Sequence, residues 1–104
     1  MKSVLRHKFN AVRCEADNIK FASKRECRRY LELKTLREKG EVVRFLRQTA
    51  FHLPGNTKYI CDFTVFWTGG EITFEDVKGM RTAVYIAKKK MVEDLYDPIK
   101  ITEI

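Results

Sequence analysis

Charged side chains interrupt two apolar runs in the second half of this chain. Asp62 stands inside the apolar run from Tyr59 to Trp67, and the next run ends in Asp76-Val77-Lys78. Alternate side chains of a strand share a face, so Asp76 and Lys78 are predicted to project side by side. Clustered carboxylates raise one another's pKa unless a cation lies among them, so this arrangement favours a divalent metal ion.

The chemistry that suits this set is hydrolysis of a phosphodiester. That reaction needs an activated water, stabilised charge on the transition state and a stabilised leaving oxygen. Asp62 and Asp76 are the predicted ligands of Mg²⁺ or Mn²⁺, with the Val77 backbone carbonyl as a third. Lys78 would orient the attacking water or offset the developing charge. The alternative for Asp76 and Lys78 alone is an ordinary cross-strand salt bridge.

A third acid, Glu26, belongs to a predicted helix. Ser23 is a good N-cap, Glu26 follows it by three residues and Gly40 ends the run, so a helix is expected over about 24–39. At 100° per residue, apolar side chains surround Glu26 on one helix face. They are Ala22, Tyr30, Leu33 and, further round, Leu36. A buried carboxylate needs a partner, so Glu26 either completes a capping box with Ser23 or belongs to the active site, where it completes the metal site or binds a second ion.

The remaining pattern predicts six further elements, with a turn between two of the strands. In chain order they are a short hairpin within 8–19, strands over 42–46 and 59–67, a turn at 68–70, a strand over 71–78, a helix over 82–96 and a strand over 99–104. The order after the hairpin is helix, three strands, helix, strand. It predicts an α/β fold with a mixed central sheet flanked by helices, in which Asp62 and Asp76 come near each other across the ladder.

The bulk composition indicates a polyanionic partner. The chain has 104 residues, which suits a single domain over 1–104 without a separate recognition domain. It has 21 Lys and Arg against 14 Asp and Glu, a formal net charge of +7, so nucleic acid is the leading candidate and a merely solubilising surface is the alternative. No signal-peptide core or membrane-spanning run is evident, so we expect a cytoplasmic protein without a membrane partner.

The cysteines do not suggest a metal site. Cys14, Cys27 and Cys61 are odd in number and form no CxxC pair, while His7 and His52 lie far from them in sequence. We expect them to be reduced packing residues. No small-molecule cofactor is expected either.

Three polar side chains outside the acidic set are candidates for DNA contacts. Gln48, expected at the end of a strand, could reach a phosphate or the water on the metal. Arg81 and Lys88, two helical turns apart near the second helix, could neutralise phosphates flanking the cut. Trp67 and Tyr59 are better explained as core residues than as platforms for bases.

The acids and the order of elements resemble the PD-(D/E)XK nuclease superfamily. More closely, the segments 19–30, 59–63 and 75–79 look like those of small phage and prophage proteins described as uncharacterised or as putative nucleases. The resemblance covers about 8–104. Cys61 stands where the motif has proline, and Asp76 replaces the commoner Glu, which leaves Glu75 as an alternative ligand through a bulge.

The resemblance implies a restriction-endonuclease-like core and a role for each matching residue. Glu26 matches the acid of the first core helix, Asp62 and Asp76 the two strand acids, and Lys78 the lysine. It implies a Mg²⁺-dependent DNA endonuclease encoded by a phage or prophage, selective for branched DNA such as a Holliday junction and acting as a homodimer. The alternatives are a non-catalytic DNA-binding or recombination accessory protein on the same fold, and a phage protein-interaction module.

Overall fold

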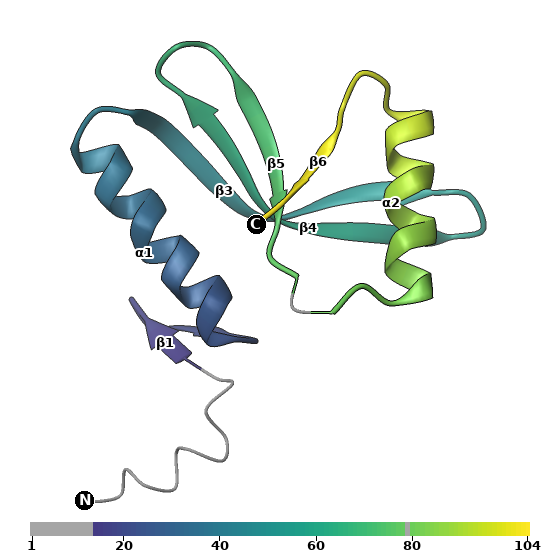
Figure 1. Ribbon diagram of the computed structural model, residues 1–104, viewed down its shortest axis with the longest axis horizontal. Coiled ribbons are helices and arrows are strands. Elements are labelled where there is room, and N and C mark those ends of the chain that lie inside the picture. The colour runs from purple at the N-terminus through teal and green to yellow at the C-terminus, as the bar shows by residue number, and fades with distance from the viewer. Residues whose placement is uncertain (1–13, 79) are drawn as a thin grey trace, which may run out of the picture.

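The computed structural model describes residues 14–78 and 80–104, which form two helices and six strands (Figure 1). In chain order the elements are β1 (Cys14–Ala16), β2 (Ile19–Phe21), α1 (Lys24–Glu38), β3 (Val42–Leu53), β4 (Thr57–Trp67), β5 (Ile72–Asp76), α2 (Ala83–Leu95) and β6 (Ile101–Glu103). The predicted order of helix, three strands, helix and strand is confirmed. The predicted hairpin is present as β1 and β2, but it reaches Phe21, and 8–13 lie outside the described residues.

The main sheet is mixed, as predicted. Its strand order is β3-β4-β5-β6, with antiparallel pairing among the first three strands and parallel pairing between β5 and β6. Parallel neighbours need a crossover connection, and α2 supplies it. The fold is therefore α/β, with helices packed on a mixed sheet.

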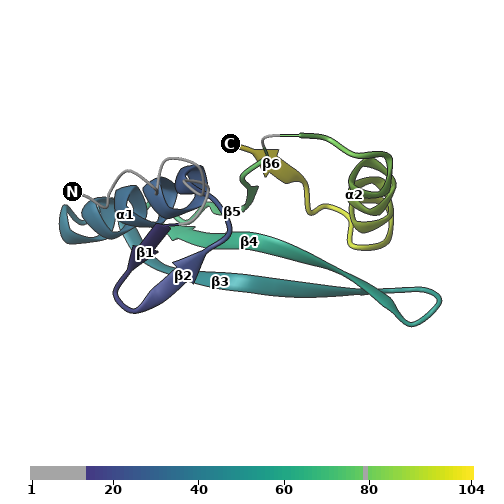
Figure 2. The ribbon, with the colours of Figure 1, turned by 90° about the horizontal axis from the view of Figure 1, so that it is seen from below.

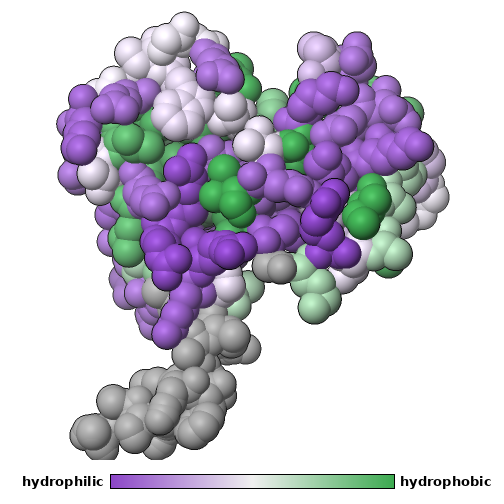
Figure 3. Space-filling view, viewed as in Figure 1, coloured by the Kyte–Doolittle hydropathy of each residue, from purple (hydrophilic) through white to green (hydrophobic). Residues whose placement is uncertain are grey.

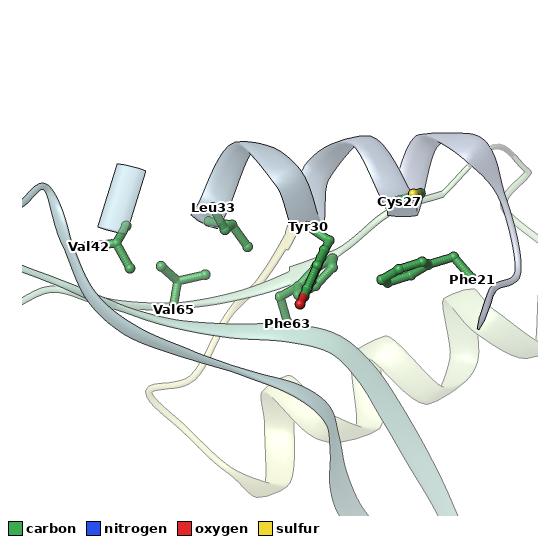
Figure 4. Packing of buried hydrophobic residues seen from close by; sticks show 7 residues of the cluster. All are labelled: Phe21, Cys27, Tyr30, Leu33, Val42, Phe63 and Val65. Carbon is green, nitrogen blue, oxygen red and sulfur yellow. The ribbon is translucent and has the colours of Figure 1, made fainter. Parts of the chain in front are cut away.

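Both helices lie on the same side of the long β3–β4 hairpin, and β5 and β6 lie between them (Figures 1 and 2). Two hydrophobic clusters fill the space. The first cluster packs α1 on the sheet and contains Phe21, Cys27, Tyr30, Leu33, Val42, Phe63 and Val65 (Figure 4). The second cluster packs α2 on the far half of the hairpin and contains Phe51, Leu53, Tyr59, Cys61, Tyr85, Val92 and Ile101.

Local signals explain where the helices begin and end. The Ser23 hydroxyl accepts a hydrogen bond from the backbone N–H of Glu26 at 3.1 Å, as expected of an N-cap. Gly40 follows α1 with a φ of 85°, a conformation that favours glycine. Thr82 caps α2 in the same way as Ser23, by accepting from the backbone N–H of Tyr85 at 3.1 Å.

All four predicted strands of the main sheet have different bounds in the structure, and the differences in β3 and β5 bear on the acids. β3 continues to Leu53 instead of ending at Leu46, because its pairing with β4 extends to Leu53 and Thr57. β5 ends at Asp76, so Val77 and Lys78 lie just beyond the strand.

Two further observations concern the cysteines and the helices. Cys61 is a free buried thiol, as expected, whereas Cys27 is disulfide-bonded, so the expectation of a reduced residue is wrong for Cys27. Neither helix in the described part of the chain is long and apolar enough to cross a membrane.

Candidate active site

Asp62 and Asp76 meet where β5 ends. Phe63 pairs with Glu75, so Asp62 and Asp76 occupy the next position of the β4–β5 ladder. Oδ2 of Asp62 accepts a hydrogen bond from the Val77 backbone N–H at 2.8 Å. Asp76 is 1% exposed. The predicted proximity of the two strand acids is thus present.

The two oxygens of Asp76 have different partners. Oδ2 accepts a hydrogen bond from the Tyr59 hydroxyl. Oδ1 lies 3.5 Å from Nζ of Lys78. The hydroxyl fixes the orientation of the carboxylate and leaves its other oxygen facing the lysine.

Lys78 is held beside Asp76 although it lies beyond the end of β5. Its Nζ is 4.5 Å from the centroid of the Tyr85 ring, so a cation–π contact adds to the ion pair. Its backbone carbonyl accepts a hydrogen bond from Nη1 of Arg25 at 2.9 Å. The Tyr85 hydroxyl donates to Glu103 on β6 at 2.7 Å, which fixes the ring on which the amine lies.

Glu26 joins the strand acids from the first turn of α1. It is 6% exposed, as its place in the apolar helix face predicted, and its Oε2 lies 3.7 Å from Nη2 of Arg47. Burial is the main cause that raises the pKa of Glu26, and the charges of Asp62 and Asp76 raise it further. Glu26 is therefore within electrostatic range of both strand acids, and we call Glu26, Asp62 and Asp76 the acid cluster.

The structure contains part of each interpretation of Glu26, the capping box with Ser23 and a place among the strand acids. Ser23 caps the helix through its hydroxyl, but the backbone N–H that lowers the pKa of the Glu26 carboxyl belongs to Ala22 and not to Ser23. The same carboxyl feels the charges of the strand acids. Glu26 thus links the helix terminus to the acid cluster.

The negative charge of the acid cluster is only partly neutralised. Burial raises the pKa of Asp62 against the effects of the Val77 N–H, Lys78 and Arg47, which lower it. Burial likewise raises the pKa of Asp76, against the attraction of Lys78. A bound cation would offset this cost. Within 14–78 and 80–104, no three His, Cys, Asp or Glu side chains are close enough to hold one ion, so a metal here would take fewer carboxylates and complete its shell with other oxygens.

Glu75, the other acid at the end of β5, is already paired with a cation of α1. Its Oε1 and Oε2 accept hydrogen bonds from Nε and Nη2 of Arg29 at 2.8 and 2.7 Å, in a bidentate ion pair with α1. Of the two candidate acids, Asp76 is the one that lies beside Lys78.

A family model described as "Protein of unknown function (DUF1064)" matches residues 6–104. The chain belongs to the DUF1064 family. Comparison with curated proteins and with solved structures gave no match.

The three candidate DNA contacts of this DUF1064 chain differ in their surroundings. Gln48 is exposed in the middle of β3 with a φ of 58°, so its expected place at a strand end is wrong. The side chain of Arg81, just before α2, is 58% exposed, and its Nε lies 3.3 Å from Oε2 of Glu103. Nζ of Lys88 donates to the Lys58 carbonyl at 3.1 Å, which directs this side chain toward β4. The face shown in Figure 3 is mostly hydrophilic, with scattered hydrophobic patches.

Sequence reasoning missed three residues that surround the acids in this DUF1064 chain. Tyr59 was expected in the core, and it is buried there, but its hydroxyl also orients Asp76. Tyr85 and Arg47 gave no signal of their own. In the sequence, Tyr85 looks like any apolar position of the second helix, and Arg47 is one of many basic residues. Their contacts join elements that are distant in sequence, so no local pattern marks them.

Proposed function

We propose that this chain is a metal-dependent endonuclease that hydrolyses phosphodiester bonds in DNA. The observation that carries the proposal is the convergence of Asp62, Asp76 and Lys78 at the end of the β4–β5 ladder, with carboxyl pKa values raised by burial. Perturbed acids beside a lysine are typical of a catalytic site. An ordinary salt bridge between Asp76 and Lys78 would not account for the raised pKa of Asp62 and Glu26.

The donor set fits Mg²⁺ or Mn²⁺. Asp62 and Asp76 offer hard carboxylate oxygens, and the Val77 carbonyl is a further candidate beside them. When bound, the ion would supply Lewis-acid stabilisation of the phosphate charge and lower the pKa of a bound water. Glu26 would act from α1, by orienting a water or by binding a second ion.

The residues of the chain itself position the phosphate. The Lys78 ammonium, held between Asp76 and the face of Tyr85, would offset charge on the reacting phosphate or orient the attacking water. Exposed Arg81 and half-buried Lys88 would contact flanking phosphates, which sets the position of the strand but carries no sequence information.

DNA shape is the proposed basis of substrate choice. The chain carries a formal net charge of +7, which favours contacts with phosphates, and such contacts respond to the shape of the DNA rather than to its base sequence. Branched substrates such as a four-way junction are therefore the proposed targets. Cutting two strands symmetrically would require a homodimer with two sites related by a two-fold axis.

The test is cleavage of end-labelled four-way junction, flap and linear duplex DNA with Mg²⁺, Mn²⁺ or EDTA. We expect metal-dependent cutting that Asp76→Asn abolishes. Asp94→Asn, which removes an exposed charge from α2, is the matched control and should cut normally. Tight DNA binding without cutting of any substrate would refute the nuclease and favour a non-catalytic DNA-binding protein. Absence of DNA binding as well would favour a protein-interaction module.

A further inference from the structure

Arg47 carries the second cation of the acid cluster, on the side of α1. Its Nη2 lies 3.7 Å from Oε2 of Glu26, and its guanidinium lies 4.7 Å from the centroid of the Phe21 ring. The charge of Arg47 also acts on Asp62, as that of Lys78 does. Asp62 is therefore within the electrostatic range of two cations that come from different elements.

The guanidinium of Arg47 is incompletely hydrogen-bonded. Its Nε is buried and has no hydrogen-bond partner within the described part of the chain. The distance of 3.7 Å between Nη2 of Arg47 and Oε2 of Glu26 is too long for a hydrogen bond. Arg29 offers a contrast within the same protein, because it forms two short hydrogen bonds to Glu75. Arg29 thus forms a complete bidentate ion pair, whereas the partly exposed guanidinium of Arg47 has only a long ion pair to Glu26 among the described residues.

The backbone next to Arg47 is strained at the same place. Gln48 has a φ of 58°, which is unusual for a residue other than glycine. Arg47 pairs with Phe63 and Thr49 with Cys61, but the ladder skips the pair between them, Gln48 and Asp62. Strain of this kind concentrates at functional sites, and here it lies directly opposite an acid of the cluster.

We infer that Arg47 binds a non-bridging oxygen of a substrate phosphate, so that the phosphate at the acid cluster is held from two sides, by Arg47 and by Lys78. The inference rests on the proposed function and adds a substrate-binding residue to it. A guanidinium matches a phosphate because its planar fork donates to two oxygens at once. Stacking on Phe21 holds that fork beside the acid cluster without using its donors.

The test compares charge removal at two positions of the same strand. Arg47→Ala removes the proposed phosphate ligand, and Arg44→Ala removes an exposed arginine of β3 as the matched control. Affinity for a fluorescently labelled four-way junction is measured by anisotropy in Ca²⁺, which takes oxygen ligands as Mg²⁺ does. We expect Arg47→Ala to weaken binding by at least about tenfold and Arg44→Ala by no more than about twofold. Arg47→Lys should not restore full affinity, because it lacks the fork.

A double variant separates phosphate binding from simple charge balance. Arg47→Ala leaves Glu26 without its cation, which could weaken folding or repel DNA, so Arg47→Ala/Glu26→Gln is compared with Glu26→Gln alone. The inference requires the double variant to bind about tenfold more weakly than Glu26→Gln, with melting temperatures confirming that both are folded. Equal affinities would show that Arg47 only neutralises Glu26, and would overturn the inference.

The outcomes also separate this inference from the proposed function. If the wild-type protein cuts DNA and Arg47→Ala binds DNA as Arg44→Ala does, the inference alone fails. If the wild-type protein binds DNA but never cuts it, while Arg47→Ala loses binding, the proposed nuclease fails and the phosphate contact stands. If the wild-type protein does not bind DNA, both fail.

Discussion

Asp76→Asn is expected to stabilise the fold and to abolish cleavage at the same time. Asp76 is 1% exposed, and burial raises the pKa of its carboxyl above the ordinary 3.8. A raised carboxyl pKa means that folding disfavours the charged form, so the charge costs stability at neutral pH. Asparagine has the same shape, and its oxygen can still accept from the Tyr59 hydroxyl.

The magnitude follows from two opposing effects. At 3.5 Å, Lys78 attracts the Asp76 carboxylate by about 5 kcal/mol if the effective dielectric constant is about 20. Burying a carboxylate costs several kcal/mol, which is of the same size. The raised pKa shows that burial outweighs the attraction. A single substitution that removes an unfavourable buried charge typically changes stability by on the order of 1 kcal/mol, so we expect a gain of that size, or about 4–8 °C in melting temperature.

The assay is thermal and urea denaturation in EDTA at about pH 7.5 and again near pH 4. The stability cost of Asp76 is present above its folded pKa and disappears as the pH falls toward 3.8, so the advantage of Asp76→Asn should vanish in acid. Asp94→Asn, on the exposed face of α2, should change stability by less than about 0.5 kcal/mol. If Asp76→Asn instead destabilises the fold at neutral pH, Asp76 is a structural partner of Lys78 and the reasoning is refuted.

Two further predictions concern the lysine and the metal. Tyr85→Phe keeps the ring beneath Lys78 and should retain most of the cleavage activity. Tyr85→Leu removes the ring and should lower kcat by about 3- to 30-fold in a folded variant. Equal kcat values for the two variants would contradict a role for the ring. Because the carboxyl pKa values of the acid cluster are raised, protons compete with a metal, and Mg²⁺ should raise the melting temperature more at about pH 7.5 than at about pH 4.5. Calorimetry measures both shifts, and equal shifts would argue against metal binding by these acids.

The local elements of the fold were largely predictable from the sequence. Ser23 and Gly40 bound α1 as expected, because capping and chain reversal depend on residues close in sequence. The acid cluster was also predictable in outline, since Asp62 and Asp76 follow from strand pairing across a short turn. Glu26 was placed correctly in the buried helix face.

The extent of β3 and the surroundings of the acids were not predictable in the same way. The polar segment around Gln48 gave no strand pattern, and it is extended because β4 supplies its hydrogen bonds. Tyr59 and Arg47 acquire their contacts through the twist of the sheet and the docking of α1. Such contacts depend on tertiary geometry, which the periodicity of one segment does not encode.

The side chains of the candidate site are held in place by both hydrophobic clusters of the core. Arg47 rests on Phe21 of the first cluster, whereas Asp76 and Lys78 rest on Tyr59 and Tyr85 of the second. Local opening of one half of a domain generally requires less free energy than global unfolding, and here it would separate these charges. If the proposed nuclease is correct, cleavage would be lost whenever either half opens locally, at a lower temperature than the melting temperature of the whole domain.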